Sequence, residues 1–457
     1  MVVAFVVLMV VLFGVSVFVH ELGHFLVAKA LGMEATVFSI GMGKALWSRQ
    51  VGRTRWQIGW LPLGGYVALP QMDPNSFLEG RSEEGGERLA DVAPWKKILV
   101  AVAGAGGNIV FAFLLGVVVW IAGKPSSLEE RNGVVGYVEA GSAAEAAGLR
   151  VGDEIVRVGE KTVGNWVEII TEVALSDGAP AELVVRRAGA EEPLIVRVPL
   201  EKSSLGNWML PGVAGMDMCH VAAVSAGSGA EAAGLKPGDQ IVEYDGQPVF
   251  SRAHLSAMVK AKGDEPSEIV VLRGGERVTA TVRAAYDEEL GRHLIGVVFN
   301  TVADLDYAML VHPTPWRQIA DHARSIWQFL RALVTPRTAK SAAGAVGGPV
   351  SIFVMLYLMI KSSFVLALWF TGFLNVNLAI INLLPLPVLD GGHVVLNLWA
   401  WVTRRPVPVA VLNVLVNGFA ILLIALFLFL TYRDSKRQLW PMIRDAIPAS
   451  ESTQEEP

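Results

Sequence analysis

The chain has 457 residues, of which 53% are hydrophobic and 18% are charged, a balance typical of integral membrane proteins. A net charge of −5, with no basic stripe carrying interleaved aromatic residues, excludes a nucleic-acid-binding surface. The single cysteine, Cys219, excludes an intrachain disulfide.

The first segment, residues 1–30, contains an apolar stretch at about 5–28 that is long enough to cross a bilayer. This stretch includes His20-Glu21-Leu22-Gly23-His24. Two histidines four residues apart on a helix project from one face, so both rings can bind one zinc ion beside the glutamate. Ionisable groups within a span are costly and are kept mainly for function. The motif therefore predicts a zinc-dependent hydrolase, with a polar helix-packing cluster as the alternative.

The same segment could be mistaken for a signal peptide, but it has no positively charged start and no clear cleavage site, so we interpret it as a retained span. The following connection, 31–97, is basic, whereas no Lys or Arg precedes the span. This asymmetry favours a cytoplasmic first loop, while the basic tail at 431–457 favours the opposite orientation. The acidic stretch Glu79 to Glu87 predicts a solvated loop.

Three further stretches, at about 98–122, 364–388 and 407–430, are also long and apolar enough to cross a bilayer. We therefore expect a polytopic α-helical membrane protein with four transmembrane helices, and with both termini on the same side.

Between the second and third spans the chain repeats itself. Ser142 to Val156 recurs 86 residues later as Ser228 to Val242, and both copies contain Ala-Gly-Leu, a basic residue and then Gly-Asp. A period of this length indicates two copies of one small α/β domain, which we place at 127–207 and 210–303. The motif resembles that of PDZ domains, which can capture an extended peptide at a sheet edge. A spacer or steric gate that binds no peptide is the alternative.

Residues 312–335 carry apolar side chains at helical spacing, with Arg317, Arg324 and Arg331 between them. This pattern predicts an amphipathic helix, either on the outer membrane surface or packed on the second repeat.

A catalytic zinc takes three protein ligands, so the two histidines need a partner. If the first span runs inward, the third does too, and their ends meet near one face of the membrane. The segment 364–390 ends at Asp390, the only carboxylate between Asn382 and His393. Prolines and a Gly-Gly pair around it predict a fixed turn, which at membrane depth is tolerated only inside protein or beside a cavity. We predict Asp390 as the third ligand, with His393 as the alternative.

The histidine motif, the Asn-x-x-Pro-x-Pro-x-Leu-Asp-Gly segment at 382–391 and the paired repeats resemble those of bacterial site-2 proteases of the regulator-of-sigma-E type. The resemblance covers essentially the whole chain. It implies Zn²⁺ held by His20, His24 and Asp390, with Glu21 as the general base.

The resemblance further implies that Asn382 and Asn377 hold the substrate backbone, for which helix–helix hydrogen bonding is the alternative role. It also implies a membrane-dipping β-hairpin, and Thr36 to Leu69 has a matching alternating, turn-rich pattern. The second span, from Ala103 to Asn108, lacks a proline that is usual in the family. This departure concerns local packing and not a metal ligand.

We therefore expect an intramembrane zinc endopeptidase that cleaves single-span membrane proteins within or near the bilayer. The resemblance implies anti-sigma factors or signal-peptide remnants as substrates, in regulated intramembrane proteolysis. It also implies a bacterial inner-membrane location, with periplasmic PDZ-like domains and the active site toward the cytoplasm. A zinc-stabilised receptor or scaffold without protease activity is the main alternative. An ion transporter is disfavoured because the chain has no inverted repeat.

Overall fold

The computed structural model describes residues 2–72, 92–203, 207–288, 291–299, 305–336, 339–405 and 407–436. They form two compact units, one of residues 1–123, 312–330 and 345–457 and the other of residues 124–311 and 331–344. The predicted loop at 79–87 and most of the predicted tail at 431–457 lie outside the described residues.

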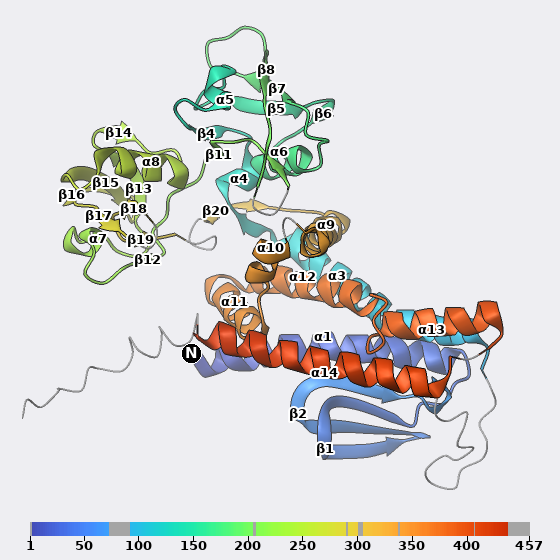
Figure 1. Ribbon diagram of the computed structural model, residues 1–457. Coiled ribbons are helices and arrows are strands. Elements are labelled where there is room, and N and C mark those ends of the chain that lie inside the picture. The colour runs from blue at the N-terminus through green and yellow to red at the C-terminus, as the bar shows by residue number, and fades with distance from the viewer. Residues whose placement is uncertain are drawn as a thin grey trace, which may run out of the picture. The chain divides into compact units, whose positions relative to one another are not determined.

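The first unit consists of apolar helices, the amphipathic helix α9 and one β-hairpin (Figure 1). Its elements are α1 (Val2–Ala30), β1 (Val37–Val51), β2 (Thr54–Ala68), η1 (Pro70–Met72), α3 (Pro94–Ala122), α9 (Pro315–Val334, whose last residues belong to the second unit), α11 (Pro349–Ser362), α12 (Phe364–Asn382), α13 (Asp390–Thr403) and α14 (Val409–Asp434).

Within the described residues, four helices are long and apolar enough to cross a membrane, which agrees with the predicted number of spans. They are Ala4–Ala30, Pro94–Ala122, Phe364–Asn382 and Ala410–Asp434. The third ends at Asn382, earlier than the predicted 364–390 segment, because Pro385 and Pro387 follow and proline cannot continue the helical hydrogen bonding.

A shorter apolar helix, α11, precedes the third span and was not predicted from the sequence. Its N-terminus is capped by Asp434 from the end of α14, whose Oδ2 accepts hydrogen bonds from the N–H groups of Gly348 and Ser351 at 2.8 and 2.9 Å. A carboxylate at this position satisfies N–H groups that have no partner within the helix. Two elements distant in sequence are thereby joined.

The β-hairpin packs against α1 through an aromatic cluster. Phe38 stacks on Trp56 with ring centroids 4.4 Å apart, and Phe25 of α1 lies 5.5 Å from Phe38. Residues 37–40 pair with 55–58 on one side and with 65–68 on the other. Residues 65–68 therefore form an edge of this small sheet, and Figure 1 shows the hairpin on one side of α1.

Small residues let α1 and α3 approach to backbone contact. A Cβ atom added to Gly23 would lie 2.9 Å from the carbonyl carbon of Ala103, and one added to Gly107 would lie 2.7 Å from the carbonyl oxygen of Val19. Only glycine fits these positions without moving a helix, as is common where membrane helices pack closely.

The amphipathic helix α9 has its buried face on two helices of the first unit. Ile326 packs with Ala112 of α3 and Val376 of α12, and Gln318 donates a hydrogen bond to the carbonyl oxygen of Gly116 at 2.9 Å. These contacts show that α9 packs on α3 and α12, partners that differ from the predicted alternative of the second repeat. Trp316 and Trp327 are exposed, although the ring of Trp316 also contacts Phe113 of α3, with ring centroids 4.8 Å apart.

The second unit contains the two sequence repeats, each built around a four-stranded sheet. The sheets have the orders β6-β5-β7-β8 and β14-β13-β15-β16 among the described residues. The elements are β3 (Lys124–Ser126), α4 (Leu128–Arg131), β4 (Val135–Val138), α5 (Ala143–Ala146), β5 (Glu154–Val158), β6 (Lys161–Thr162), α6 (Trp166–Ala174), β7 (Ala181–Arg186), β8 (Leu194–Val198), β9 (Glu201–Lys202), β10 (Trp208–Met209), β11 (Val213–Gly215), β12 (Ala223–Val224), α7 (Gly229–Ala232), β13 (Gln240–Tyr244), β14 (Gln247–Pro248), α8 (Arg252–Lys262), β15 (Ser267–Arg273), β16 (Glu276–Val282), β17 (Ala285–Asp287), β18 (Arg292–Leu294), β19 (Val297–Val298), β20 (Asp306–Val311) and α10 (Ala339–Ala345).

The two repeats contain the same buried ion pair. In the first, Arg187 donates to both carboxylate oxygens of Asp153 at 2.7 and 2.8 Å, and in the second, Arg273 donates to both oxygens of Asp239 at 2.7 Å. Burial opposes ionisation of Asp239, but the hydrogen bonds from Arg273 and from the Lys236 N–H outweigh it and lower the pKa of Asp239. Each pair ties the Gly-Asp turn to a strand end of its own sheet.

One repeat boundary differs from the sequence-based expectation. Strand β11, at 213–215, pairs with β4 of the first repeat, although the sequence places it in the second repeat at 210–303. The first repeat therefore extends beyond residue 207. The corresponding pairing in the second repeat joins β12 with β19. A strand of three residues gives too short an alternating pattern to be assigned to a sheet from sequence.

Candidate metal centre

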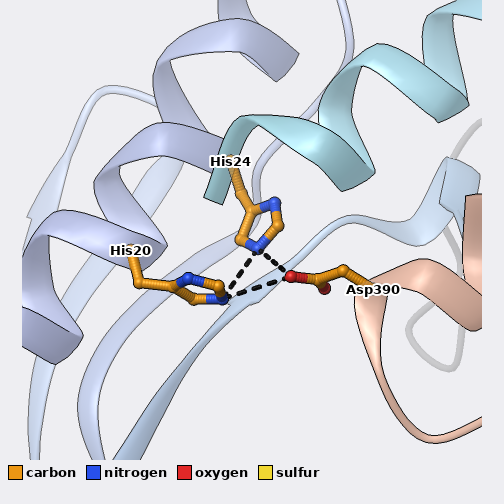
Figure 2. A group of neighbouring side chains, drawn as sticks. All are labelled: His20, His24 and Asp390. Carbon is orange, nitrogen blue, oxygen red and sulfur yellow. Dashed lines mark hydrogen bonds and ion pairs between the residues drawn. The ribbon is translucent and has the colours of Figure 1, made fainter. Parts of the chain in front are cut away.

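Three side chains from distant parts of the chain converge in the first unit (Figure 2). The Nε2 atoms of His20 and His24 lie 3.3 Å apart, and each lies 3.3 Å from Oδ2 of Asp390. Figure 2 shows both rings on one face of α1 and the carboxylate of Asp390 pointing at them from the start of α13. The three ligand atoms thus form a triangle with nearly equal sides.

The size of this triangle fits a tetrahedral zinc ion. Ligand atoms about 2.0–2.1 Å from zinc and at tetrahedral angles are about 3.3–3.4 Å from one another. The charge distribution fits as well, because Oδ2 of Asp390 is buried and no donor among the described residues meets hydrogen-bond geometry toward it. Burying a carboxylate oxygen without a hydrogen bond is costly, and a bound cation would offset that cost.

The turn before α13 places Asp390 at the site. A Cβ atom on Gly391 would lie 2.5 Å from the carbonyl carbon of Leu383, and one on Gly392 would lie 2.8 Å from that of Leu386. The chain after α12 therefore folds tightly back against the first turn of α13, and only glycine allows this. His393, the alternative ligand, lies one turn into α13 and is not part of the described ligand cluster.

Helix α3 supplies no ligand but contacts both imidazole rings. Nδ1 of His24 lies 2.7 Å from the carbonyl oxygen of Val100, and Nδ1 of His20 lies 3.2 Å from the side-chain amide of Asn108. Gly104 lies between these two contacts, and a Cβ atom there would overlap Nε2 of His24 and lie 2.8 Å from Cε1 of His20. The rings therefore occupy the space that a side chain at position 104 would fill.

Glu21 lies beside the ligands and faces the edge strand of the hairpin. Its side chain is buried, with 9% of its surface exposed, and its carboxylate accepts a hydrogen bond from the backbone N–H of Val67. A Cβ atom on Gly65 would lie 2.9 Å from Cγ of Glu21. The absence of a side chain at Gly65 thus lets the strand approach the glutamate.

The predicted substrate-binding asparagines have different surroundings. Nδ2 of Asn382 lies 3.4 Å from Nε2 of His20, so this amide is at the site. Asn377 is half-buried and lies more than a helical turn earlier on α12. Asn375, not singled out in the sequence, is fully buried and donates to Oγ of Ser16 and to the carbonyl of Thr371.

Two residues that contact the ligands were missed as site residues. Asn108 and Gly104 were visible only as part of a glycine-rich stretch in the second span. A polar amide in an otherwise apolar span is the signal that could have identified Asn108.

Comparison with known proteins gives a family match over most of the chain. The model of peptidase family M50 matches residues 8–426. The regulator of sigma-E protease of Escherichia coli is 28% identical over 459 residues, covering 94% of this chain and 97% of that protein. The corresponding protease of Salmonella typhimurium is 29% identical, with coverage of 84% and 88%. A Neisseria meningitidis protein, named as a candidate zinc metalloprotease, is 27% identical, with coverage of 88% and 92%.

Among solved structures, the PDZ domain of an SdrC-like protein from Listeria innocua matches 18% of this chain and 92% of its own length, at 25% identity and a TM-score of 0.17.

Proposed function

The chain belongs to peptidase family M50, and we propose that it is a zinc-dependent intramembrane endopeptidase of the site-2 type. Its substrates are single-span membrane proteins, cleaved within or near the membrane-spanning segment. The observation that carries the proposal is the 3.3 Å ligand triangle beside a buried glutamate, on helices apolar enough to cross a membrane.

In this proposal His20, His24 and Asp390 hold the zinc ion. The chemistry that zinc supplies in such sites is the activation of water and the polarisation of a carbonyl group. Glu21 accepts the proton of the attacking water and delivers it to the leaving amide nitrogen. The glutamate is suited to this role because it lies one residue from a ligand and is held by the N–H of Val67.

A helical substrate must be unwound before its peptide bonds can be attacked, because they are hydrogen-bonded within the helix. The edge at residues 65–68 lies beside Glu21 and offers an extended backbone for pairing. We assign the holding of the substrate backbone to this edge and to the amide of Asn382. Asn377 stays a prediction from the resemblance, with no contact to the ligands that supports it.

The two repeats are assigned as tandem PDZ-like domains on the periplasmic side of the bacterial inner membrane, with the metal centre toward the cytoplasm. The basic character of the 31–97 connection supports this orientation. The repeats would screen the outer part of the substrate, either by capturing a peptide or by acting as a steric gate. Anti-sigma factors and signal-peptide remnants are the expected substrate classes.

The test uses purified full-length protein with measured zinc content and a panel of single-span reporter substrates. Glu21→Gln should retain zinc and lose at least about 100-fold in cleavage rate, since it removes the base and leaves the ligands. Asp390→Asn should lose both zinc and cleavage. Glu34→Gln is the matched control. Glu34 pairs with Arg53 and lies outside the ligand cluster, so this variant removes a carboxylate that the site does not use.

A wild-type chain that binds zinc but cleaves no reporter would favour the receptor or scaffold alternative. Cleavage by Glu21→Gln at the wild-type rate would refute the assignment of the base.

A further inference from the structure

We propose that Asn108 is a positioning residue of the metal centre, whose amide oxygen accepts a hydrogen bond from Nδ1–H of His20 and holds Nε2 of that ring toward the metal. The inference rests on the proposed zinc site. It adds to that site a residue of α3, a helix that contributes no ligand.

The direction of the His20 ring determines what its partner must be. Nε2 faces His24 and Asp390, so Nδ1 is the nitrogen that points away from the ligand cluster. A neutral imidazole that binds a metal through Nε2 carries its hydrogen on Nδ1. The group facing Nδ1 must therefore be an acceptor.

The amide of Asn108 is the group 3.2 Å from that nitrogen. Nδ2 of this amide faces the ring, while Oδ1 is buried with no hydrogen-bond partner among the described residues. The two ends of an amide have nearly the same shape, so their assignment follows from the hydrogen-bond network. In this orientation, the Nδ2 donor of Asn108 would face the Nδ1–H donor of His20. Turning the amide by 180° places Oδ1 there instead, where it accepts a hydrogen bond from Nδ1–H and so gains a partner.

The other ring has the same arrangement without ambiguity. Nδ1 of His24 lies 2.7 Å from the carbonyl oxygen of Val100, which can only accept. Val100 and Asn108 are both on α3, eight residues or about two turns apart, and so lie on similar faces of that helix. One helix thus supplies an acceptor to each histidine, by its backbone for His24 and by a buried side chain for His20.

The test measures zinc affinity of the purified full-length protein by competition with a chelator. Asn108→Leu removes the acceptor and should weaken zinc binding about 10- to 100-fold, the usual effect of losing such a partner. Asn108→Asp should restore affinity to the wild-type value or tighter, because its carboxylate can accept but not donate. The absorption spectrum of the Co²⁺-substituted protein should change in Asn108→Leu and be retained in Asn108→Asp.

Asn375→Leu is the matched control, because it removes another fully buried amide that bonds to Ser16 and not to a ligand. It should leave zinc affinity unchanged. If Asn108→Leu does not accumulate, the smaller Asn108→Ala takes its place.

Wild-type zinc affinity in Asn108→Leu would overturn the proposal, as would equal losses in Asn108→Leu and Asn108→Asp, or an equal loss in Asn375→Leu. A zinc-binding, proteolytically active wild type would leave the proposed function standing in each of these cases. A wild-type chain that binds no zinc would overturn both.

Discussion

Replacing Gly104 with alanine should disrupt the metal centre from a helix that supplies no ligand. The added methyl group would lie 2.6 Å from Cε1 of His24 and 2.8 Å from Cε1 of His20, and it would overlap Nε2 of His24. Carbon atoms in good contact are about 3.5–4.0 Å apart, so the rings or α3 must move by roughly 0.9 Å or more. A misplacement of about 1 Å in a preorganised site costs about 100-fold in reaction rate, and disturbing the groups that orient metal ligands costs about 10- to 100-fold in metal affinity. We therefore expect zinc affinity to fall about 100-fold, or about 2.8 kcal/mol.

The assay is chelator competition on the solubilised full-length protein, with cleavage of a single-span reporter as the second measurement. Gly106→Ala is the control, because it lies on the same helix and a Cβ atom there would have nothing within 4 Å. It should bind zinc as the wild type does, and the better helix propensity of alanine should if anything stabilise α3. Equal zinc affinity in Gly104→Ala and Gly106→Ala would refute the reasoning, since the rings would then not be confined by α3.

Three further outcomes are expected. Gly391→Ala should weaken zinc binding at least about tenfold, because its methyl group displaces the turn that holds Asp390; unchanged affinity in the same competition assay would contradict this. The lowered pKa of Asp239 means that its stabilising contribution is present above its ordinary pKa of 3.8 and is lost as the pH falls toward its folded-state pKa. Arg273→Met should therefore destabilise the second repeat at neutral pH and reduce this acid sensitivity, as measured by hydrogen exchange on the full chain. Asp434→Ala should cost about 1 kcal/mol through loss of the α11 cap, seen as a lower Tm, and an unchanged Tm would count against it.

Part of the candidate site could be predicted from the sequence. These were the residues whose positions follow from spacing along one helix or from the order of the spans. The four-residue spacing of His20 and His24 predicts that they share a face, and the alternation of span directions brings Asp390 to the same end of the bundle. Both inferences depend on helix geometry alone. The proximity of the three side chains in the structure agrees with them.

The contribution of α3 could not be predicted in this way. Whether Asn108 and Gly104 touch the rings depends on how closely α3 packs against α1, and that distance is set by glycines whose role is visible only when both helices are placed. The same limit applies to α11, which is too short for a span, and to β11, whose sheet partner precedes it by some 75 residues. Long-range pairing of short elements leaves little periodic signal.

The two buried Asp–Arg pairs also indicate that the two repeats arose by duplication. Asp153 and Asp239 are 86 residues apart, and so are Arg187 and Arg273. The spacing between acid and base is therefore identical in both copies, although the loops within them differ in sequence. A duplication of one ancestral domain that already had this pair explains the match. Because each pair lies inside its own copy, the outer surfaces of the two copies can differ without loss of the shared fold.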